Sequence, residues 1–181
     1  MEYRVPFSSQ YADLGHHEWR ARGCGIAALK MVMDFWHAAD GSNRTVALDG
    51  LLQAGLDAGA YREGIGWTHG GLAVLARRHG YEAFNADWAA KSPTPKTPEA
   101  AWAQLVRELN VGPVMASVYS RLDSERGGGH IVVVTGFADG LVAFNDPEEM
   151  SEREGRKLIA LERFLPAFKL RYVVVRPKAS A

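Results

Sequence analysis

The first half of the chain has apolar residues at helical spacing. Residues 24–37 are apolar nearly all round, and their only polar stripe is Lys30, Asp34 and His37 at positions i, i+4 and i+7. Such a narrow polar stripe predicts a helix that is buried on most sides. Weaker patterns predict three further helices, at residues 46–57, 69–79 and 98–110, with Thr68 capping the second and Thr97 or Pro98 beginning the third.

The pattern changes from residue 113 onward. Short runs rich in Val, Ile, Phe and Tyr follow one another there, as is typical of strands. These runs cover residues 113–119, 130–137, 141–147, 156–161 and 170–177. Helices followed by strands predict an α+β fold, with a helical N-terminal half packed on an antiparallel sheet from the C-terminal half. The 181 residues are expected to form one domain, with a helical part at about 1–110 and a sheet part at about 111–181.

One segment between the two halves has neither pattern. Residues 85–99 carry three prolines and are predicted to form a surface loop, which is a candidate lid over a cleft.

The balance of charge narrows the classes of function. The chain has 21 basic and 21 acidic residues and no net formal charge, so it lacks the basic field that nucleic-acid binding requires. Its apolar runs are far shorter than the ~20 residues that span a bilayer, and no signal segment follows Met1. We therefore expect a soluble, cytoplasmic protein, unless a signal segment has been removed. The single cysteine excludes a disulfide scaffold.

That cysteine lies at a chemically favourable place. Cys24 sits between Gly23 and Gly25, where the buried helix is expected to begin. A helix N-terminus stabilises a thiolate through its partial positive charge and its free N–H groups. The two glycines would let a substrate backbone approach closely, because they carry no side chain. Buried structural cysteines are common, so a catalytic interpretation requires further residues.

A histidine and an aspartate in the sheet half supply the partners that a cysteine nucleophile needs. His130 follows three glycines, the last of which is Gly129, and opens the run 130–137. An imidazole can stabilise the thiolate and protonate the leaving group, and it needs an acceptor that orients its second nitrogen. Asp146 ends the next predicted strand and is the candidate acceptor.

Strand register decides between Asp146 and its neighbour Asn145. A three-residue turn of Ala-Asp-Gly would place Asp146 on the face of His130. A two-residue turn, in which Ala138 pairs directly with Leu141, would place Asn145 there instead. The residues fit the three-residue turn, and this register predicts Asp146 as the partner of the histidine.

Gln10 completes the set, because its side-chain amide could donate to a developing oxyanion together with the backbone N–H of Cys24. Each residue alone has an ordinary explanation: a buried thiol, a strand-end histidine, a turn-forming aspartate and a surface glutamine. Their combination is what indicates a catalytic site.

Other candidates have weaker support. Trp67 is a candidate wall of a substrate cleft, although core packing explains it equally well. His69 is a possible rival base, but its place at a predicted helix start favours a capping or surface role. His16 and His17 match no standard zinc spacing, so no metal is expected, and thiolate chemistry needs no cofactor.

Several segments together resemble a known family. In order they are VPFSSQYADLGHHEWRARGCGIAALKMVM, GWTHGGL, GPVMASV, GGGHIVVVTGF and FNDP. They resemble the papain-like cysteine peptidase superfamily, and within it the branch of bacteriocin-processing peptidase domains that cut after double-glycine leaders, with their stand-alone relatives. The resemblance implies a papain-like fold with a cleft between the halves. By motif, Gln10 would be the oxyanion donor, Cys24 the nucleophile, His130 the general base and acid, and Asp146 the orienting residue.

These observations predict a cysteine hydrolase, most simply a peptidase that cleaves a peptide or protein substrate through a thioester. Substrate contacts are expected at Gly23, Gly25, Trp67 and Gly129. An acyltransferase is an alternative that would pass the same thioester to an amine or alcohol, and acyl-amine products would reveal it. A peptide-binding module of the same fold is another, and an unreactive Cys24 would favour it.

Overall fold

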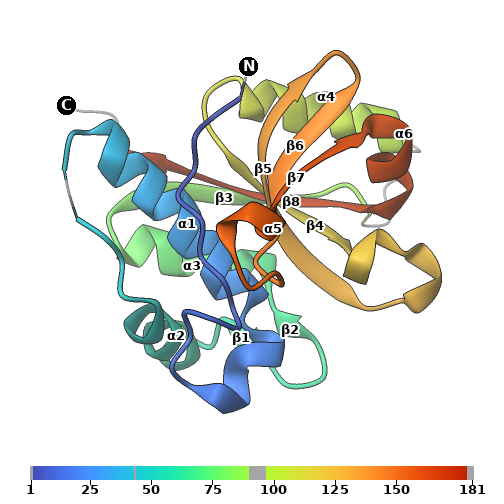
Figure 1. Cartoon of the computed structure of the whole chain (residues 1–181). Helices are drawn as coiled ribbons and strands as arrows, with labels where there is room; N and C mark the ends of the chain where they lie inside the picture. Colours follow the sequence, from blue (N-terminus) through green and yellow to red (C-terminus); the bar gives the residue numbers. More distant parts are fainter. Residues whose placement is uncertain (1, 43, 90–96, 179–181) are drawn as a thin grey trace.

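A six-stranded sheet runs through the centre of the molecule in the order β3–β8–β4–β5–β6–β7 (Figure 1). The computed structural model describes residues 2–42, 44–89 and 97–178. All neighbouring strands are antiparallel. The strands are β3 (Tyr81–Asp87), β4 (Val114–Tyr119), β5 (Gly129–Ala138), β6 (Leu141–Asn145), β7 (Arg156–Ala160) and β8 (Phe168–Pro177). The predicted α+β fold is therefore confirmed.

Three helices lie on one face of this sheet; the first and third contact the strands, and the second packs mainly on these two helices. They are α1 (Cys24–Ala39), α2 (Leu48–Asp57) and α3 (His69–Arg78). The apolar α1 is buried against alternate positions of the strands, such as Met115 and Val133. Thr68 caps α3 as predicted, because its Oγ1 accepts a hydrogen bond from Gly71 N at 3.1 Å.

The opposite face is covered by α4 (Pro98–Leu109) and the short α6 (Leu161–Phe164) (Figure 1). Thr97 is the N-cap of α4, since its Oγ1 accepts from Ala100 N at 3.2 Å, and Pro98 occupies the first helical turn. The core therefore has two parts, one on each side of the sheet. Within the described residues, no helix is both long and apolar enough to cross a membrane.

The N-terminal half also contributes strands that the sequence did not predict. β3 pairs with β8 over residues 81–87, so the predicted loop at 85–99 begins too early; residues 90–96 of that loop lie outside the described residues. Pairing with β8 gives this half-exposed segment its backbone partners. A small hairpin of β1 (Tyr61–Arg62) and β2 (Gly66–Trp67) was likewise not expected.

The predicted three-residue turn between β5 and β6 is wrong. Ala138 pairs directly with Leu141, so the turn has two residues, Asp139 and Gly140, with φ of 52° and 75°. Positive φ at both positions is typical of a type I′ turn, whose twist matches that of the two strands.

A β-bulge then shifts the register by one residue. Gly136 pairs with Ala143 but Val134 pairs with Phe144, which leaves Thr135 as the extra residue of β5. Beyond the bulge the register is the one that a three-residue turn would have produced. Asp146 therefore meets His130, although the turn that led to this prediction does not form.

The N-terminal segment ties this end of the sheet together. Tyr3 N donates to the carbonyl of Thr135, and Gln10 N donates to the carbonyl of Pro147, both at 2.8 Å. Asp146 N in turn donates to the carbonyl of Gly155, which ends the short helix α5 (Glu152–Gly155), at 2.8 Å. The loop after β6 is thus fixed on both sides, and so is the position of Asp146.

Candidate active site

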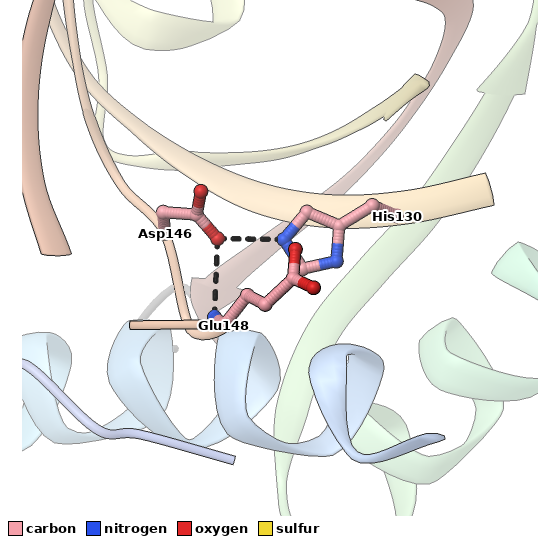
Figure 2. Close-up of side chains that lie close together, drawn as sticks. All are labelled: His130, Asp146 and Glu148. Carbon is pink, nitrogen blue, oxygen red and sulfur yellow. Dashed lines mark hydrogen bonds and ion pairs between the residues drawn. The ribbon is translucent and has the colours of Figure 1, made fainter. Parts of the chain in front are cut away.

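His130 and Asp146 are in direct hydrogen-bond contact. His130 lies near the start of β5, and Asp146 follows β6. The distance from His130 Nε2 to Asp146 Oδ1 is 2.7 Å, and both residues are buried (Figure 2). Asn145 points elsewhere, because its Nδ2 donates to the carbonyl of Val5 at 3.2 Å. The aspartate, and not the asparagine, is therefore the partner of the histidine.

The Asp146 carboxylate has further partners. Its Oδ1 also accepts from Glu148 N at 3.1 Å, and its Oδ2 accepts from Lys157 Nζ at 3.0 Å. Lys157 bridges onward to Glu149 at 2.6 Å. Burial alone would raise the pKa of Asp146, but the hydrogen bond from His130 and the charges of His130 and Lys157 outweigh it and lower that pKa. Asp146 is a carboxylate at neutral pH.

The environment of His130 favours its charged form. Burial alone would lower the pKa of the imidazole, but hydrogen bonds to Asp146 and Cys24, with the charges of both groups, raise it well above 6.5. Since Nε2 is engaged by Asp146, Nδ1 is the nitrogen available to the sulfur. The structure thus brings three of the predicted residues, Cys24, His130 and Asp146, into one chain of contacts.

Cys24 and His130 open into a cleft of about 440 Å³. Cys24 is the first residue of α1 and is half-buried. The cleft lies between the helical layer and the strands, as the resemblance implied. Trp67 and Gly129 line it. Trp67 also donates from Nε1 to the carbonyl of Arg22 at 2.6 Å. The same side chain is therefore both part of the buried core and part of the cleft lining.

The other predicted site residues, Gln10, Gly23 and Gly25, lie around the start of α1. A Cβ at Gly23 would be 3.1 Å from Gln10 Cβ, and a Cβ at Gly25 would be 2.8 Å from the Trp67 side chain. Both glycines are buried, and their small size lets Gln10 and Trp67 pack against the start of α1. Gln10 Nε2 donates to the carbonyl of Arg20 at 2.8 Å. The oxyanion role of Gln10 and substrate contact at the two glycines stay predictions.

One cluster has the composition of a metal site. Donor atoms of His130, Asp146 and Glu148 lie within 4.8 Å of one another. Figure 2 shows the Glu148 carboxylate beside the imidazole, with Asp146 already bonded to it. An ion would have to displace that hydrogen bond and compete with Lys157 for Asp146. We therefore interpret the cluster as part of the charge network around His130.

Sequence reasoning missed several polar residues of the site. His69, considered above as a rival base, lines the cleft at the start of α3, but Thr68 provides the cap; burial, with the charge of Arg171, lowers the pKa of the His69 imidazole. The residues that were missed are Lys157, which contacts Asp146, and Asp87, Lys169 and Arg171, which line the cleft. None of these four residues belongs to a local motif. Only the pairing of β3, β7 and β8 with the rest of the sheet places them here.

A sequence profile described as the Peptidase_C39 like family matches residues 2–176. The chain belongs to the Peptidase_C39-like family. A comparison with curated proteins gave no match.

Solved structures of similar fold include several peptidases and peptidase domains. A double-glycine motif protease from an AMS/PCAT transporter, in complex with the leader peptide, is 22% identical with a TM-score of 0.62, covering 98% of this chain and 94% of its own. A C39-like peptidase from Bacillus anthracis is 18% identical with a TM-score of 0.64, covering 99% and 97%. The peptidase domain of Streptococcus ComA, a bi-functional ABC transporter, is 16% identical with a TM-score of 0.55, covering 87% and 93%. At these identities the likeness shows the papain-like C39 fold alone, and fold and family together point to a peptidase.

Proposed function

We propose that this C39-like protein is a cysteine peptidase that cleaves a peptide bond through a thioester intermediate. The observation that carries the proposal is the arrangement around His130. One ring nitrogen is bonded to Asp146 at 2.7 Å, and Cys24 contributes to the raised pKa of the same ring. A histidine held in this way favours a thiolate–imidazolium pair, which is the reactive form of a cysteine peptidase.

The proposed reaction uses the Cys24 thiolate, the His130 imidazolium and two N–H donors for the oxyanion. The Cys24 thiolate attacks the carbonyl carbon, and the oxyanion is stabilised by the Cys24 N–H at the start of α1 and by the second N–H of Gln10. His130 Nδ1–H gives its proton to the leaving amine, so the C–N bond breaks and a thioester remains. His130 then takes a proton from water, which attacks the thioester and releases the acid and the thiolate.

The test is hydrolysis of quenched peptide pools by the wild type and by single variants. Cys24→Ala and His130→Ala should each lower kcat/KM by about 10³-fold or more, because nucleophile and base act as a unit. The matched control is His79→Ala, which changes an exposed histidine at the end of α3 and should cleave like the wild type. Undiminished hydrolysis by Cys24→Ala would rule out the mechanism.

A further inference from the structure

The cleft beside Cys24 carries more positive than negative charge. Among its described lining residues, Arg22, Lys169 and Arg171 are cationic, and Asp87 is the only carboxylate. Arg171 is paired with Asp87 across β8 and β3 at 3.1 Å. Arg22 lies 3.5 Å from Glu63 at the exposed rim. Arg171 and Arg22 thus each have a carboxylate nearby, and Lys169 is the third cation of the cleft lining.

The backbone of β8 directs Lys169 into the cleft. Arg171 pairs with Ser117 but Phe168 pairs with Val118, so Lys169 and Leu170 form an irregularity in the strand. Leu170 has φ of 57°, and its carbonyl accepts from Trp88 N at 2.9 Å, which holds this backbone in place. The position of the lysine is therefore fixed by the sheet.

The ammonium lies close to the catalytic histidine. A Cβ at Gly129, the residue before His130, would be 3.7 Å from Lys169 Nζ. The same ammonium lies 4.7 Å from the centre of the Tyr119 ring, which steadies the side chain by a cation–π contact. A substrate segment that passes over Gly129 would meet this charge.

No carboxylate compensates Lys169 within residues 2–42, 44–89 and 97–178. Its pKa is lowered by partial burial and by the charge of Arg171. An anion bound here would raise the pKa of Lys169 again, because its negative charge would pair with a half-buried ammonium and offset the nearby charge of Arg171. The cleft thus has the electrostatics of a carboxylate site.

We propose that Lys169, supported by Arg171, forms a carboxylate-binding subsite that makes the enzyme prefer a substrate with an acidic group over Gly129. The carboxylate could be an Asp or Glu side chain or the α-carboxylate at the end of the peptide. The inference rests on the proposed peptidase function, since it assigns a substrate preference to that site. Lys169 would then be a specificity-determining residue beside the candidate catalytic residues.

The first test measures cleavage of quenched octapeptide pools in which each position in turn is Glu, Gln or Lys. At one of these positions, the kcat/KM of the wild type should be about tenfold higher for the pool with Glu than for the pool with Gln. Lys169→Met should lose that preference, Lys169→Glu should favour Lys instead, and Lys169→Arg should retain it. Lys178→Met, an exposed lysine beyond the far end of β8, is the matched control. Free-acid and amidated peptides distinguish an α-carboxylate from a side chain.

The second test needs a reactive thiol but no hydrolysis. Cys24 is alkylated with iodoacetate, which is anionic, and with iodoacetamide, which is neutral. The rate with iodoacetate divided by the rate with iodoacetamide should fall several-fold in Lys169→Met and further in Lys169→Glu. The reason is that these variants lack the ammonium that attracts the anionic reagent. Using the ratio removes differences in the intrinsic reactivity of the thiol.

The two tests separate the two proposals. If the alkylation ratio follows Lys169 while no peptide pool is cleaved, the carboxylate subsite stands and the peptidase proposal fails. If peptides are cleaved with equal preference for Glu and Gln, and the ratio is the same in all variants, the subsite is refuted and the peptidase proposal stands.

Discussion

His130 has a different partner for each ring nitrogen. Nε2 faces Asp146, which is itself held by Lys157 and by Glu148 N, and Nδ1 is left for the sulfur of Cys24. A carboxylate with three donors is a fixed and charged acceptor, so it sets both the orientation and the charge of the imidazole. At the scale of single residues, this chain of contacts is what turns a cysteine at a helix start into a candidate nucleophile.

The charge of Asp146 can be separated from its hydrogen bond. Asp146→Asn keeps an acceptor for His130 but removes the negative charge that helps to raise the histidine pKa. The alkaline limb of the pH profile of kcat/KM should therefore move to lower pH, by about one unit or more. Asp139→Asn changes an exposed turn residue of the same hairpin and should leave the limb in place. An unchanged limb in Asp146→Asn would mean that the carboxylate charge does not act on the histidine.

The catalytic candidates could be predicted from the sequence, whereas the supporting residues could not. Cys24 and His130 stand in recognisable local contexts, a helix start between glycines and a strand start after glycines. Lys157 and Lys169 have no such context, because their positions depend on which strands become neighbours. A single sequence gives strands but not their order in the sheet.

At the scale of elements, the hairpin of β5 and β6 shows how two irregularities can offset each other. The turn is one residue shorter than predicted, and the bulge at Thr135 adds the residue back within β5. The tight turn was recognisable as a turn, since Asp-Gly is typical of type I′. Gly136, which follows Thr135 inside the strand pattern, is compatible with a bulge but does not specify the extra residue. The carbonyl of Thr135 accepts from Tyr3 N of the distant N-terminal segment, a contact that the local sequence does not indicate. The predicted contact of Asp146 with His130 therefore forms, although the register from which it was predicted is wrong near the turn.

The turn itself gives a prediction on stability. Gly140 has φ of 75° with open space where a side chain would lie, so Gly140→Ala should lower the free energy of unfolding by about 1 kcal/mol through backbone strain alone. Gly50, exposed within α2, is the matched control, and Gly50→Ala should raise the free energy of unfolding by about 0.5–1 kcal/mol. Urea unfolding measures both. Equal effects of the two variants would contradict the positive-φ argument.

At the scale of the whole molecule, the site is built where the helical layer meets the sheet. The candidate nucleophile comes from α1, the histidine and aspartate from the ends of β5 and β6, and the cations Lys169 and Arg171 from β8. The overall division into helices and sheet could be read from the apolar pattern, because that pattern reflects burial. The participation of β3 could not, because its residues are mostly exposed and lack a clear alternating pattern.

The ion pair of His130 and Asp146 also predicts how the free energy of unfolding depends on pH. In the folded protein the pKa of His130 is raised from 6.5. The contribution of His130 to the free energy of unfolding is therefore complete below pH 6.5 and is lost as the pH rises through the folded pKa. The folded pKa of Asp146 is lowered from 3.8, so its contribution is complete above pH 3.8 and is lost on acidification through the folded value. Both contributions are complete between pH 3.8 and 6.5.

The measurement is urea unfolding of the wild type and Asp146→Asn across the pH range. The difference in unfolding free energy should be largest in that window and should shrink by about 1 kcal/mol or more at alkaline pH. Asp139→Asn leaves the His130–Asp146 pair intact and should not show this loss at alkaline pH. A difference for Asp146→Asn that grows as the pH rises would contradict the raised histidine pKa.

The most direct test of the account is the rate of Cys24 alkylation by iodoacetamide as a function of pH, in the wild type and in His130→Ala. Cys24 is the only cysteine, so the label reports on this thiol alone. An unperturbed thiol ionises near pH ~8.5. A thiolate–imidazolium pair predicts fast labelling that persists well below neutral pH in the wild type and is lost in His130→Ala. Labelling that follows an ordinary thiol and is the same in both proteins would contradict the central claim.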